Sequence, residues 1–289
     1  MFRCGYVTIV GKPNVGKSTL LNTILGEKIS AISPKPQTTR KRIRGIYTGN
    51  DFQIIFQDCP GFTKREDALN AFIREEIKKA LEDSDVIGYV TDARKPDSPR
   101  EISEFVGDSK APVIVIANKI DLVGDEKKKK IIGLYRDFDT ILISALHGYG
   151  VDELIEKIKD LLPERPPLFP EDYLTDQPIR FLASEIIREK VFLYLEEELP
   201  YSVYVSIEDF DERDDLVYIR AFLYVERESQ KGIVIGSNGN MIKKISMEAR
   251  KDIEHLIGKK VYLELRVKVH KKWSKKTGFF KRYSKDLLS

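Results

Sequence analysis

The sequence predicts an α/β domain with a mainly parallel sheet over residues 1–162, followed by a smaller α+β domain over residues 178–270. Short apolar runs alternate with amphipathic stretches through the first part, which is typical of parallel strands connected by helices. Four prolines then fall within residues 163–170, so this stretch forms neither a helix nor a central strand. We expect a semi-rigid linker over residues 163–177 and a basic tail over residues 271–289.

The first domain is expected to alternate short strands with helices. The strands are apolar runs bounded by polar or glycine residues, at positions 6–10, 54–57, 86–91, 113–117 and 140–143. The amphipathic stretches between and after them predict helices at positions 19–25, 68–83, 98–106, 126–135 and 151–161. Sheets of this class bind ligands at the carboxyl ends of their strands. Four short motifs stand where one of these strands has just ended.

The first motif fits a phosphate-binding loop, with the sequence Gly11-Lys12-Pro13-Asn14-Val15-Gly16-Lys17-Ser18. It follows a strand and opens a helix, which is the context that the motif requires. Its glycines let backbone N–H groups turn inward around phosphate, and the helix N-terminus adds a positive dipole. We expect Lys17 to reach the β- and γ-phosphates and Ser18 to bind Mg²⁺. The expected nucleotide-binding residues here are Gly11, Asn14, Val15, Gly16, Lys17, Ser18 and Thr19.

The second motif is Asp58-Cys59-Pro60-Gly61, after the strand at 54–57. A carboxylate at this strand end suits the Mg²⁺ shell, and the Gly61 N–H suits the γ-phosphate. Between the first two motifs, residues 29–40 are polar and lack periodicity, as expected of a loop that is ordered by the γ-phosphate and Mg²⁺. A threonine hydroxyl in this loop would complete the metal shell, and from the residues alone Thr38 and Thr39 are equal candidates.

The third and fourth motifs are Asn118-Lys119-Ile120-Asp121 and Ser144-Ala145-Leu146. The Asp121 carboxylate suits the N1–H and the exocyclic amine of guanine, a donor pair that adenine lacks. Such a site rejects the wrong base by orders of magnitude, because its carboxylate is then left unpaired. Lys119 would lay its alkyl stem on the base, Asn118 would tie this loop to the phosphate loop, and Ser144-Ala145 would give a backbone N–H to guanine O6. The sequence thus predicts GTP and GDP as ligands.

The residue after the second motif is Phe62, where many small GTPases carry the Gln that orients the attacking water. A phenyl ring cannot hydrogen-bond water. We therefore expect slow hydrolysis of GTP unless a partner or a cation assists. Arg40 and Arg65 lie nearby in the sequence, but the pattern assigns neither of them as an arginine finger.

The second domain is expected to begin with a helix at 178–195 and strands at 202–210 and 216–225. A short helical run at 231–235, the loop Gly236-Ser237-Asn238-Gly239, a helix at 241–256 and a strand at 260–269 follow. Charge is divided unevenly here. Residues 171–230 carry 6 Lys and Arg against 16 Asp and Glu, whereas residues 231–289 carry 16 against 5. Such a basic block suits a polyanion, although a solvated basic tail would have the same composition.

A glycine loop between two helices is the pattern with which KH domains clamp single-stranded nucleic acid. Small residues let the phosphodiester approach, and the N-terminus of the following helix favours phosphate. The expected RNA-binding residues are the loop, apolar residues that would floor a base groove, and two lysines: Gly236, Ser237, Asn238, Gly239, Ile233, Val234, Ile235, Ile242, Lys243 and Lys244. The acidic turn at 209–215 should face away from RNA. Trp273 is equally suited to stack on a base or to pack on the domain.

Composition limits the setting in which the protein acts. With 289 residues and 42% hydrophobic residues, the chain is long enough for two cores. No apolar run reaches the roughly 18 residues of a membrane span, and the first residues leave no room for a signal peptide before a strand. Cys4 and Cys59 lack metal-binding spacing and a disulfide framework. We expect a cytoplasmic monomer, and peripheral contact with the cytoplasmic face of the cell membrane stays open.

The motifs together resemble those of the Era family, within the TrmE-Era-EngA class of GTPases that carry a hydrophobic residue in place of the catalytic Gln. The resemblance rests on the four motifs, Phe62, the segment Gln37-Thr38-Thr39-Arg40, the segment Tyr173-Leu174-Thr175-Asp176 and the glycine loop. It implies a P-loop GTPase domain followed by a type II KH domain. It also implies binding to the 3′ region of small-subunit ribosomal RNA and a role in assembling the small ribosomal subunit.

The family pattern also implies residue roles that the composition and spacing leave open. Thr39 would be the Mg²⁺ ligand beside Ser18 and Asp58. Asn14 would help to hold a potassium ion near the leaving group, although an asparagine there could equally cap local backbone. The residues implied to act in hydrolysis are Lys17, Asn14, Thr39 and Gly61.

Two other classes of function are compatible with parts of the sequence. The chain could be a protein-binding signalling GTPase whose second domain is a scaffold, and binding of a short ribosomal RNA segment would separate this class from an RNA-binding factor. A metabolic kinase could also use the phosphate loop. Asn118 and Asp121 argue against a kinase, and a comparison of GTP with ATP binding tests it.

Overall fold

The chain folds into two compact units, which divide between Asp176 and Gln177. The structure is a computed structural model that describes residues 1–33, 35, 42–61, 68–271 and 273. Each unit is described by itself. No helix in this described part of the chain has the length and apolar character needed to cross a lipid bilayer.

The first unit is built on a six-stranded sheet with the order β2-β3-β1-β4-β5-β6. The strands are β1 (Arg3–Val10), β2 (Ile43–Thr48), β3 (Phe52–Asp58), β4 (Val86–Asp92), β5 (Val113–Asn118) and β6 (Asp139–Leu142). Only β2 runs antiparallel to its neighbour, β3. All other described pairs are parallel, so the predicted mainly parallel sheet is confirmed.

Strand β2 was absent from the sequence-based expectation. It is short, and Gly45 interrupts its apolar pattern. The glycine is required by packing rather than by turn geometry. A Cβ at Gly45 would lie 2.6 Å from Leu21 and 2.7 Å from Leu25, both on helix α1 (Lys17–Leu25). The close approach of α1 therefore selects a residue that weakens the strand signal.

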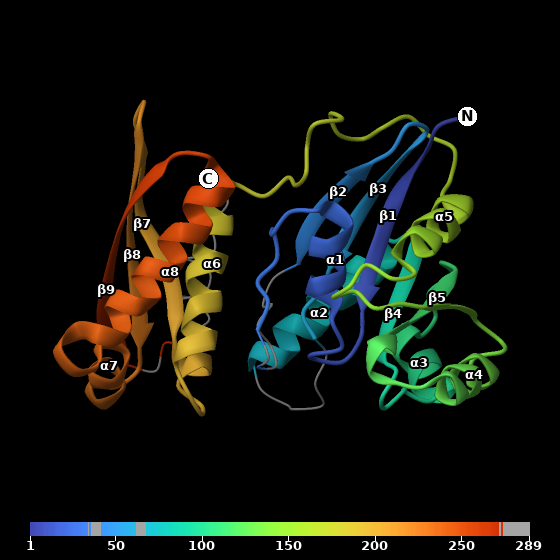
Figure 1. The fold of residues 1–289 in the computed structure, drawn as a ribbon, viewed down its shortest axis with the longest axis horizontal. Helices are drawn as coiled ribbons and strands as arrows, with labels where there is room; N and C mark the ends of the chain where they lie inside the picture. Colours follow the sequence, from blue (N-terminus) through green and yellow to red (C-terminus); the bar gives the residue numbers. More distant parts are fainter. Residues whose placement is uncertain (34, 36–41, 62–67, 272, 274–289) are drawn as a thin grey trace. The chain divides into compact units, whose positions relative to one another are not determined.

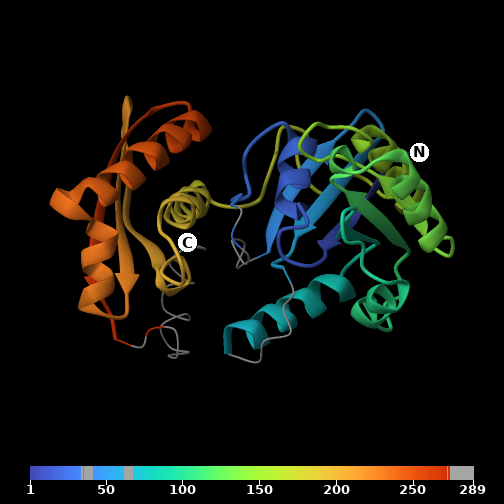
Figure 2. The ribbon, with the colours of Figure 1, turned by 60° about the horizontal axis from the view of Figure 1, so that its bottom comes forward.

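Helices cover both faces of this sheet. One face carries α2 (Ala68–Glu82), α3 (Pro99–Val106) and α4 (Asp125–Leu134), whose apolar residues share one core with β4 and β5. Helix α1 packs against β2 and β3 from the other face, on the side opposite to α2 (Figure 2). Helix α5 (Val151–Leu161) follows the last strand and buries Leu154 and Ile158 (Figure 1).

The strand registers bring the sequence motifs to one edge of the sheet. Ile9 pairs with Asp58, Val10 pairs with Tyr89, and Asp92 pairs with Asn118. The phosphate loop, the second motif and the base motif therefore leave the sheet side by side. Because parallel strands end at the same edge, residues distant in sequence converge there.

The predicted linker, up to Asp176, belongs to the first unit and follows the edge of its sheet. The Ile46 N–H of β2 donates to the Leu174 carbonyl at 2.8 Å. The Arg44 guanidinium pairs with Asp176 at 2.6 Å. The Gln53 side chain accepts the N–H groups of Leu168 and Phe169 at 2.8 and 3.0 Å. Residues 163–176 are thus held to strands β2 and β3.

The second unit contains a three-stranded sheet with two long helices on one face (Figure 1). Its elements follow the predicted order: α6 (Ile179–Tyr194), β7 (Tyr204–Glu212), β8 (Leu216–Val225), α7 (Glu228–Ile235), α8 (Asn240–Ile257) and β9 (Lys260–Val269). Strand β8 pairs antiparallel with β7 and parallel with β9. The core lies between this sheet and the apolar stripes of α6 and α8.

Trp273 packs on the second unit. Its ring is 2% exposed and lies against Tyr204, Phe222 and Tyr224. Its Nε1–H donates to the Ser202 carbonyl at 3.1 Å. Of the two roles that the sequence left open for Trp273, the structure shows packing, because an indole buried in this way is not available to stack on a base.

Candidate nucleotide site and nucleic-acid interface

The phosphate loop requires glycine at two positions and has a left-handed residue between them. Gly11 and Gly16 have φ angles of 146° and 103°, and Asn14 lies at 61°. A Cβ at Gly11 would come within 2.2 Å of the Val90 carbonyl oxygen, and one at Gly16 would come equally close to the Asn118 amide. Side chains at these two glycines would therefore force the loop off the strand and off the base motif.

Lys17 is buried at the centre of this loop. Its Nζ donates to the carbonyl oxygens of Gly11 at 3.1 Å and Lys12 at 2.9 Å, which aims it along the inside of the loop. Burial lowers the pKa of Lys17 to about 8, against the weaker opposing effect of Asp58. A buried ammonium with an easily lost proton gains most from an anionic partner. Phosphate oxygens are such a partner.

The carboxylate of Asp58 lies beside the Ser18 hydroxyl. The hydroxyls of Ser18 and Ser30 donate to its Oδ2 atom at 2.7 and 2.8 Å. Its Oδ1 atom is buried and has no hydrogen-bond partner in the described part of the chain, and burial raises the pKa of the carboxyl group. An orphaned carboxylate oxygen beside two hydroxyls fits a hard divalent cation such as Mg²⁺. The residues present therefore suit the metal that the sequence predicted.

Asn118 ties the base motif to its two neighbouring motifs. Its Nδ2 atom donates to the Val15 carbonyl in the phosphate loop at 2.8 Å. Its Oδ1 atom accepts the N–H groups of Lys119 and Ala145 at 2.7 and 2.9 Å. The structure thus places Asn118 in the tying position that the sequence suggested. Asn118 thus engages the Ala145 N–H, one of the two N–H groups of Ser144-Ala145 from which we expected a donor to guanine O6.

Asp121 is oriented by the fourth motif. The Ser144 hydroxyl donates to its Oδ1 atom at 2.5 Å, which leaves the second carboxylate oxygen toward the loop that contains His147. Leu146, the next residue of this motif, is 74% exposed. The hydrogen bond from Ser144 fixes the rotamer of the Asp121 carboxylate before any nucleotide binds.

Gly61 brings the second motif against the phosphate loop. A Cβ at this position would lie 2.8 Å from the Cα atom of Pro13. The backbone of Gly61 can therefore approach the loop only because it lacks a side chain. The other residues expected in the switch loops, Thr38, Thr39 and Phe62 among them, lie outside the described residues.

Asp92 belongs to this site, and the sequence reasoning missed it. Its carboxylate accepts Lys119 Nζ at 2.9 Å and Arg94 Nη2 at 2.7 Å. Lys119 Nζ also donates to the Asn14 carbonyl at 2.5 Å. Burial alone would raise the pKa of Asp92, but the hydrogen bonds from Arg94 and Lys119 outweigh it and hold the pKa well below its usual range. The signal that could have found Asp92 is a carboxylate at the end of β4.

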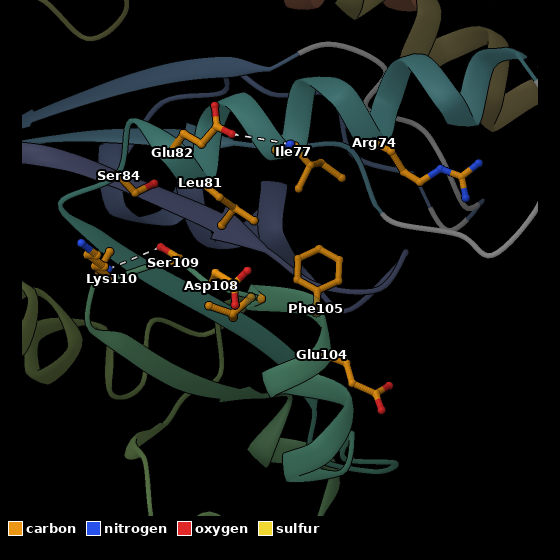
Figure 3. Close-up of a pocket in the computed structure, with 14 residues that line it drawn as sticks. Arg74, Ile77, Leu81, Glu82, Ser84, Glu104, Phe105, Asp108, Ser109 and Lys110 are labelled. Carbon is orange, nitrogen blue, oxygen red and sulfur yellow. Dashed lines mark hydrogen bonds and ion pairs between the residues drawn. The ribbon is translucent and has the colours of Figure 1, made fainter.

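The nucleotide site is distinct from the pocket between α2 and α3. That pocket encloses about 760 Å³ and is lined by Ile77 and Leu81 on one helix and by Phe105 on the other (Figure 3). None of the four motifs contributes a lining residue. This pocket therefore does not mark the nucleotide site.

The glycine loop of the second unit has one position that only glycine can fill. Gly236 has a φ angle of 73°, and a Cβ there would lie 2.7 Å from the Cβ atom of Met241. Gly239 has a φ angle of 76°, but a Cβ there would meet nothing within 4 Å. Helix α8 begins at the next residue, Asn240. The unpaired N–H groups of its first turn therefore follow the loop directly.

The residues around this loop divide between the surface and the core. Ile233 is 59% exposed, and Lys243 and Lys244 are exposed. Lys244 Nζ lies 4.3 Å from the centre of the Tyr194 ring, a cation–π contact between α8 and α6. Val234 is fully buried in the core. Its expected place in a base groove is therefore wrong, because helix α7 turns this side chain inward.

The acidic turn after β7 lies at the far end of the sheet from this loop (Figure 1). Strand β8 spans ten residues, from Leu216 to Val225, and connects the turn at one end with α7 at the other. At about 3.3 Å per residue, this strand separates the two ends by roughly 30 Å. The acidic residues are thus kept away from the glycine loop.

Comparison with known proteins bears on both units. A family model described as a 50S ribosome-binding GTPase matches residues 6–119, and a KH domain model matches residues 198–274. The chain is 45% identical to the GTPase Era of Thermoanaerobacter sp. (strain X514), over 97% of this chain and 95% of that protein. It is 46% identical to the GTPase Era of Thermotoga maritima, over 95% and 94% of the two chains. This chain belongs to the Era family of GTPases.

Solved Era structures share the whole fold. A variant of Aquifex aeolicus Era bound to GDP·AlF4⁻ matches with a TM-score of 0.92 and 42% identity, over 98% of this chain and 99% of that one. Era in complex with MgGDPNP and nucleotides 1506–1542 of 16S ribosomal RNA matches with the same score, identity and coverage. The predicted fold class, a P-loop GTPase domain followed by a KH domain, is confirmed. So is the predicted activity, GTP hydrolysis by a member of this family.

Proposed function

We propose that this Era-family GTPase binds the 3′ region of small-subunit ribosomal RNA through its KH unit and assists assembly of the small ribosomal subunit. The observation that carries the proposal is the presence of two sites in one chain. One is the guanine-selecting site, and the other is the glycine loop within the basic block of residues 231–289, which leads into a helix without a side-chain N-cap. The related Era that was solved with 16S ribosomal RNA supports the same partner here. A cytoplasmic location follows from this partner.

We assign the nucleotide chemistry to the residues that converge on the sheet edge. The backbone N–H groups of the phosphate loop and Lys17 bind the phosphates, and Asp121 selects guanine. Ser18, Asp58 and Thr39 would hold Mg²⁺, which neutralises phosphate charge when bound. The Gly61 N–H would bind the γ-phosphate, and the close approach of the Gly61 backbone to Pro13 in the phosphate loop supports this assignment.

Hydrolysis by this site is expected to be slow on its own, because Phe62 replaces the residue that orients water. We assign Asn14 to a potassium site that adds positive charge near the leaving group. Its backbone carbonyl accepts a hydrogen bond from Lys119 Nζ, which restrains the main chain that carries this side chain. Turnover should be several-fold faster in K⁺ than in Na⁺, and Asn14→Ala should remove the difference. Equal turnover of the unmodified chain in both salts would contradict this assignment.

We propose that RNA lies along the glycine loop, with phosphate at the start of α8. Lys243 and Lys244 are exposed on the first turns of this helix, and Ile233 offers apolar surface on the other side of the loop. The cation–π contact with the Tyr194 ring restricts the Lys244 side chain before RNA binds. The lysine therefore loses less conformational entropy when it binds phosphate.

The RNA proposal is tested with two substitutions at one glycine. Gly239→Asp and Gly239→Asn have similar shape and place their Cβ in open space, and Asn and Asp tolerate the positive φ of 76° at this position better than most side chains, so both should keep the fold at a similar cost in strain. Only Gly239→Asp adds a negative charge beside the phosphodiester. We expect at least about 10-fold weaker binding of a 3′ small-subunit RNA oligonucleotide for Asp than for Asn, as measured by fluorescence anisotropy.

The same titration separates the competing function. If the unmodified chain and both Gly239 variants bind this RNA no better than an unrelated oligonucleotide, the second unit is not a ribosomal RNA module. The remaining function would then be a signalling GTPase whose KH unit is a protein scaffold. Loss of RNA binding at raised salt, with a slope that decreases in Lys243→Ala, would support phosphate contact.

A further inference from the structure

The second residue of the phosphate loop, Lys12, does not point at the phosphate position. Its Nζ donates to the Asp97 carboxylate and to Glu101 Oε1, the latter at 3.0 Å. Both acids belong to the segment that joins β4 to α3 and to the first turn of α3. Hydrogen bonding to Asp97 is the main cause that raises the pKa of Lys12. This lysine is therefore engaged outside the loop.

Asp97 is fixed by a network that is independent of Lys12. Its side chain is 5% exposed, and its Oδ2 atom accepts the Tyr89 and Thr91 hydroxyls of β4 at 3.1 and 3.2 Å. Its backbone N–H donates to Thr91 Oγ1 at 2.9 Å, and its carbonyl accepts the Tyr135 hydroxyl at 2.6 Å. The carboxylate thus has one position, set by β4 and by the end of α4.

A carboxylate buried to this degree requires a cation or strong hydrogen bonds. Lys12 is the cation that reaches it, and the main chain of Lys12 is part of the phosphate loop. The carbonyl groups of Gly11 and Lys12 are also the acceptors that aim Lys17. A displacement of Lys12 would therefore move the residue that binds the β- and γ-phosphates.

A second acid restrains the other side of the loop. Asp92, at the end of β4, holds Lys119, and Lys119 donates to the Asn14 carbonyl. Asp92 and Asp97 both lie within residues 92–98, and each restrains the phosphate loop through one lysine. Lys12 carries one restraint into the start of the loop, and Lys119 carries the other to the Asn14 carbonyl in its middle.

We propose that Asp97 is a positioning residue, which holds the phosphate loop in its nucleotide-binding conformation through Lys12. The proposal rests on the nucleotide site assigned above. A loop held before binding loses less conformational freedom on binding, so affinity rises without new contacts to the ligand. The benefit is the same for GTP, for GDP and for the transition state. Loss of the restraint should therefore raise KM and leave kcat nearly unchanged.

The test compares Lys12→Met, Lys12→Arg, Asp97→Asn and the double variant Lys12→Met with Asp97→Asn, all in the full chain. We expect Lys12→Met and Asp97→Asn each to raise the KM for GTP and the Kd for GDP by about 10-fold, with kcat within about 3-fold. Lys12→Arg keeps the charge and should stay within about 3-fold of the unmodified protein. The double variant should lose no more than Lys12→Met alone, because the pair acts as one unit.

Glu104→Gln is the matched control, since Glu104 lies on the same helix in an exposed ion pair with Arg100. It should change neither KM nor Kd. The proposal is overturned if Asp97→Asn weakens binding as much in the Lys12→Met background as in the unmodified chain. It is also overturned if Lys12→Met weakens GTP binding far more than GDP binding, since Lys12 would then contact the γ-phosphate.

Two further readouts keep these outcomes separate. Melting curves show whether Asp97→Asn is folded at the assay temperature, and if it is not, the comparison of Lys12→Met with Lys12→Arg decides alone. Equal loss of GDP affinity in these two variants would overturn the proposal. The nucleotide site itself is tested separately, by comparing the binding of GTP, GDP and ATP to the unmodified chain. If that chain does not prefer GTP and GDP over ATP, the assignment of the nucleotide site is rejected.

Discussion

At the scale of single residues, the nucleotide site is a set of polar groups that are already oriented by one another. Asp121 is held by Ser144, Asn118 connects two loops, and Lys17 is aimed by carbonyl groups of its own loop. Each of these groups is buried or partly buried, where hydrogen bonds are stronger than in water. Binding of a nucleotide by these groups would therefore require little rearrangement of their side chains.

Base selection at Asp121 can be tested by exchanging one atom. Asp121→Asn replaces an acceptor oxygen by an amide donor, which opposes the donor pair of guanine and suits the carbonyl of xanthine. We expect GTP affinity to fall by about 100-fold or more and XTP affinity to rise. Ser144→Ala, which removes only the orienting hydrogen bond, should cost about 10-fold. Competition binding with a fluorescent nucleotide measures both, and unchanged preference for GTP in Asp121→Asn would contradict the assignment.

Lys17 gives nucleotide binding a dependence on pH. In the free protein burial lowers its pKa to about 8, because the nearby Asp58 carboxylate offsets only part of the cost of burying the ammonium group. Phosphate favours the ammonium form, so the pKa in the complex must be higher, and binding takes up protons between the two values. Affinity for GDP should therefore be greatest below pH 8 and fall as the pH rises through 8. Calorimetry in two buffers of different ionisation enthalpy measures the protons, which should disappear in Lys17→Met.

At the scale of elements, strand β2 and the segment 163–176 depend on each other. Strand β2 is the edge of the sheet, and an edge leaves a row of unpaired backbone groups. The Leu174 carbonyl and Thr175 hydroxyl bond to this strand, and Arg44 is paired with Asp176. A segment rich in proline thus covers an edge that would otherwise be open.

Gln53 makes three hydrogen bonds to that segment. Gln53→Leu would remove the acceptor of the Leu168 and Phe169 N–H groups and the donor to the Phe169 carbonyl. We expect a loss of about 2–4 kcal/mol in the free energy of unfolding, because buried backbone groups are left unpaired. Thr48→Val removes one bond to Gln53 and should cost about 1 kcal/mol or less. Urea denaturation gives both values, and faster hydrogen exchange in residues 163–176 should accompany Gln53→Leu alone.

At the scale of the whole molecule, one strand connects the nucleotide site with the chain that leads to the KH unit. Strand β2 begins just after the loop that is expected to respond to the γ-phosphate, and the same strand holds residues 174–176. A ligand shifts an equilibrium only through different affinity for its states. Any effect of GTP on RNA binding must therefore appear as a ratio of affinities.

RNA should bind with different affinity to the GTP-analogue and GDP forms, by a factor of about 5–150. The same factor must appear when RNA is present and the two nucleotides are titrated. Asp176→Asn weakens the pairing with Arg44 and should reduce the factor while leaving GDP affinity unchanged. Anisotropy titrations of RNA in both nucleotide states supply the measurement. Equal RNA affinity in the two states would reject the coupling.

Much of the nucleotide site was predictable because its chemistry depends on short motifs. Glycines at fixed spacing, Lys17, Asp58 and Asp121 each have a role that few other residue types could fill. The apolar alternation also predicted the parallel strands and the element order of the second unit. Strand β2 was missed because Gly45 serves the packing of α1, and Val234 was misassigned because sequence does not show which side of α7 faces the core.

By itself, the sequence determined the ligand class, the two units and the position of the glycine loop, because these depend on local chemistry and on periodicity. The tertiary structure decided which distant groups meet. Asp97 and Lys12 are 85 residues apart, and Ser30 reaches Asp58 only after the sheet has formed. It also showed that Trp273 packs on the second unit and is not available to stack on a base. Contacts of this kind depend on how parallel strands bring their ends together, and no local pattern records them.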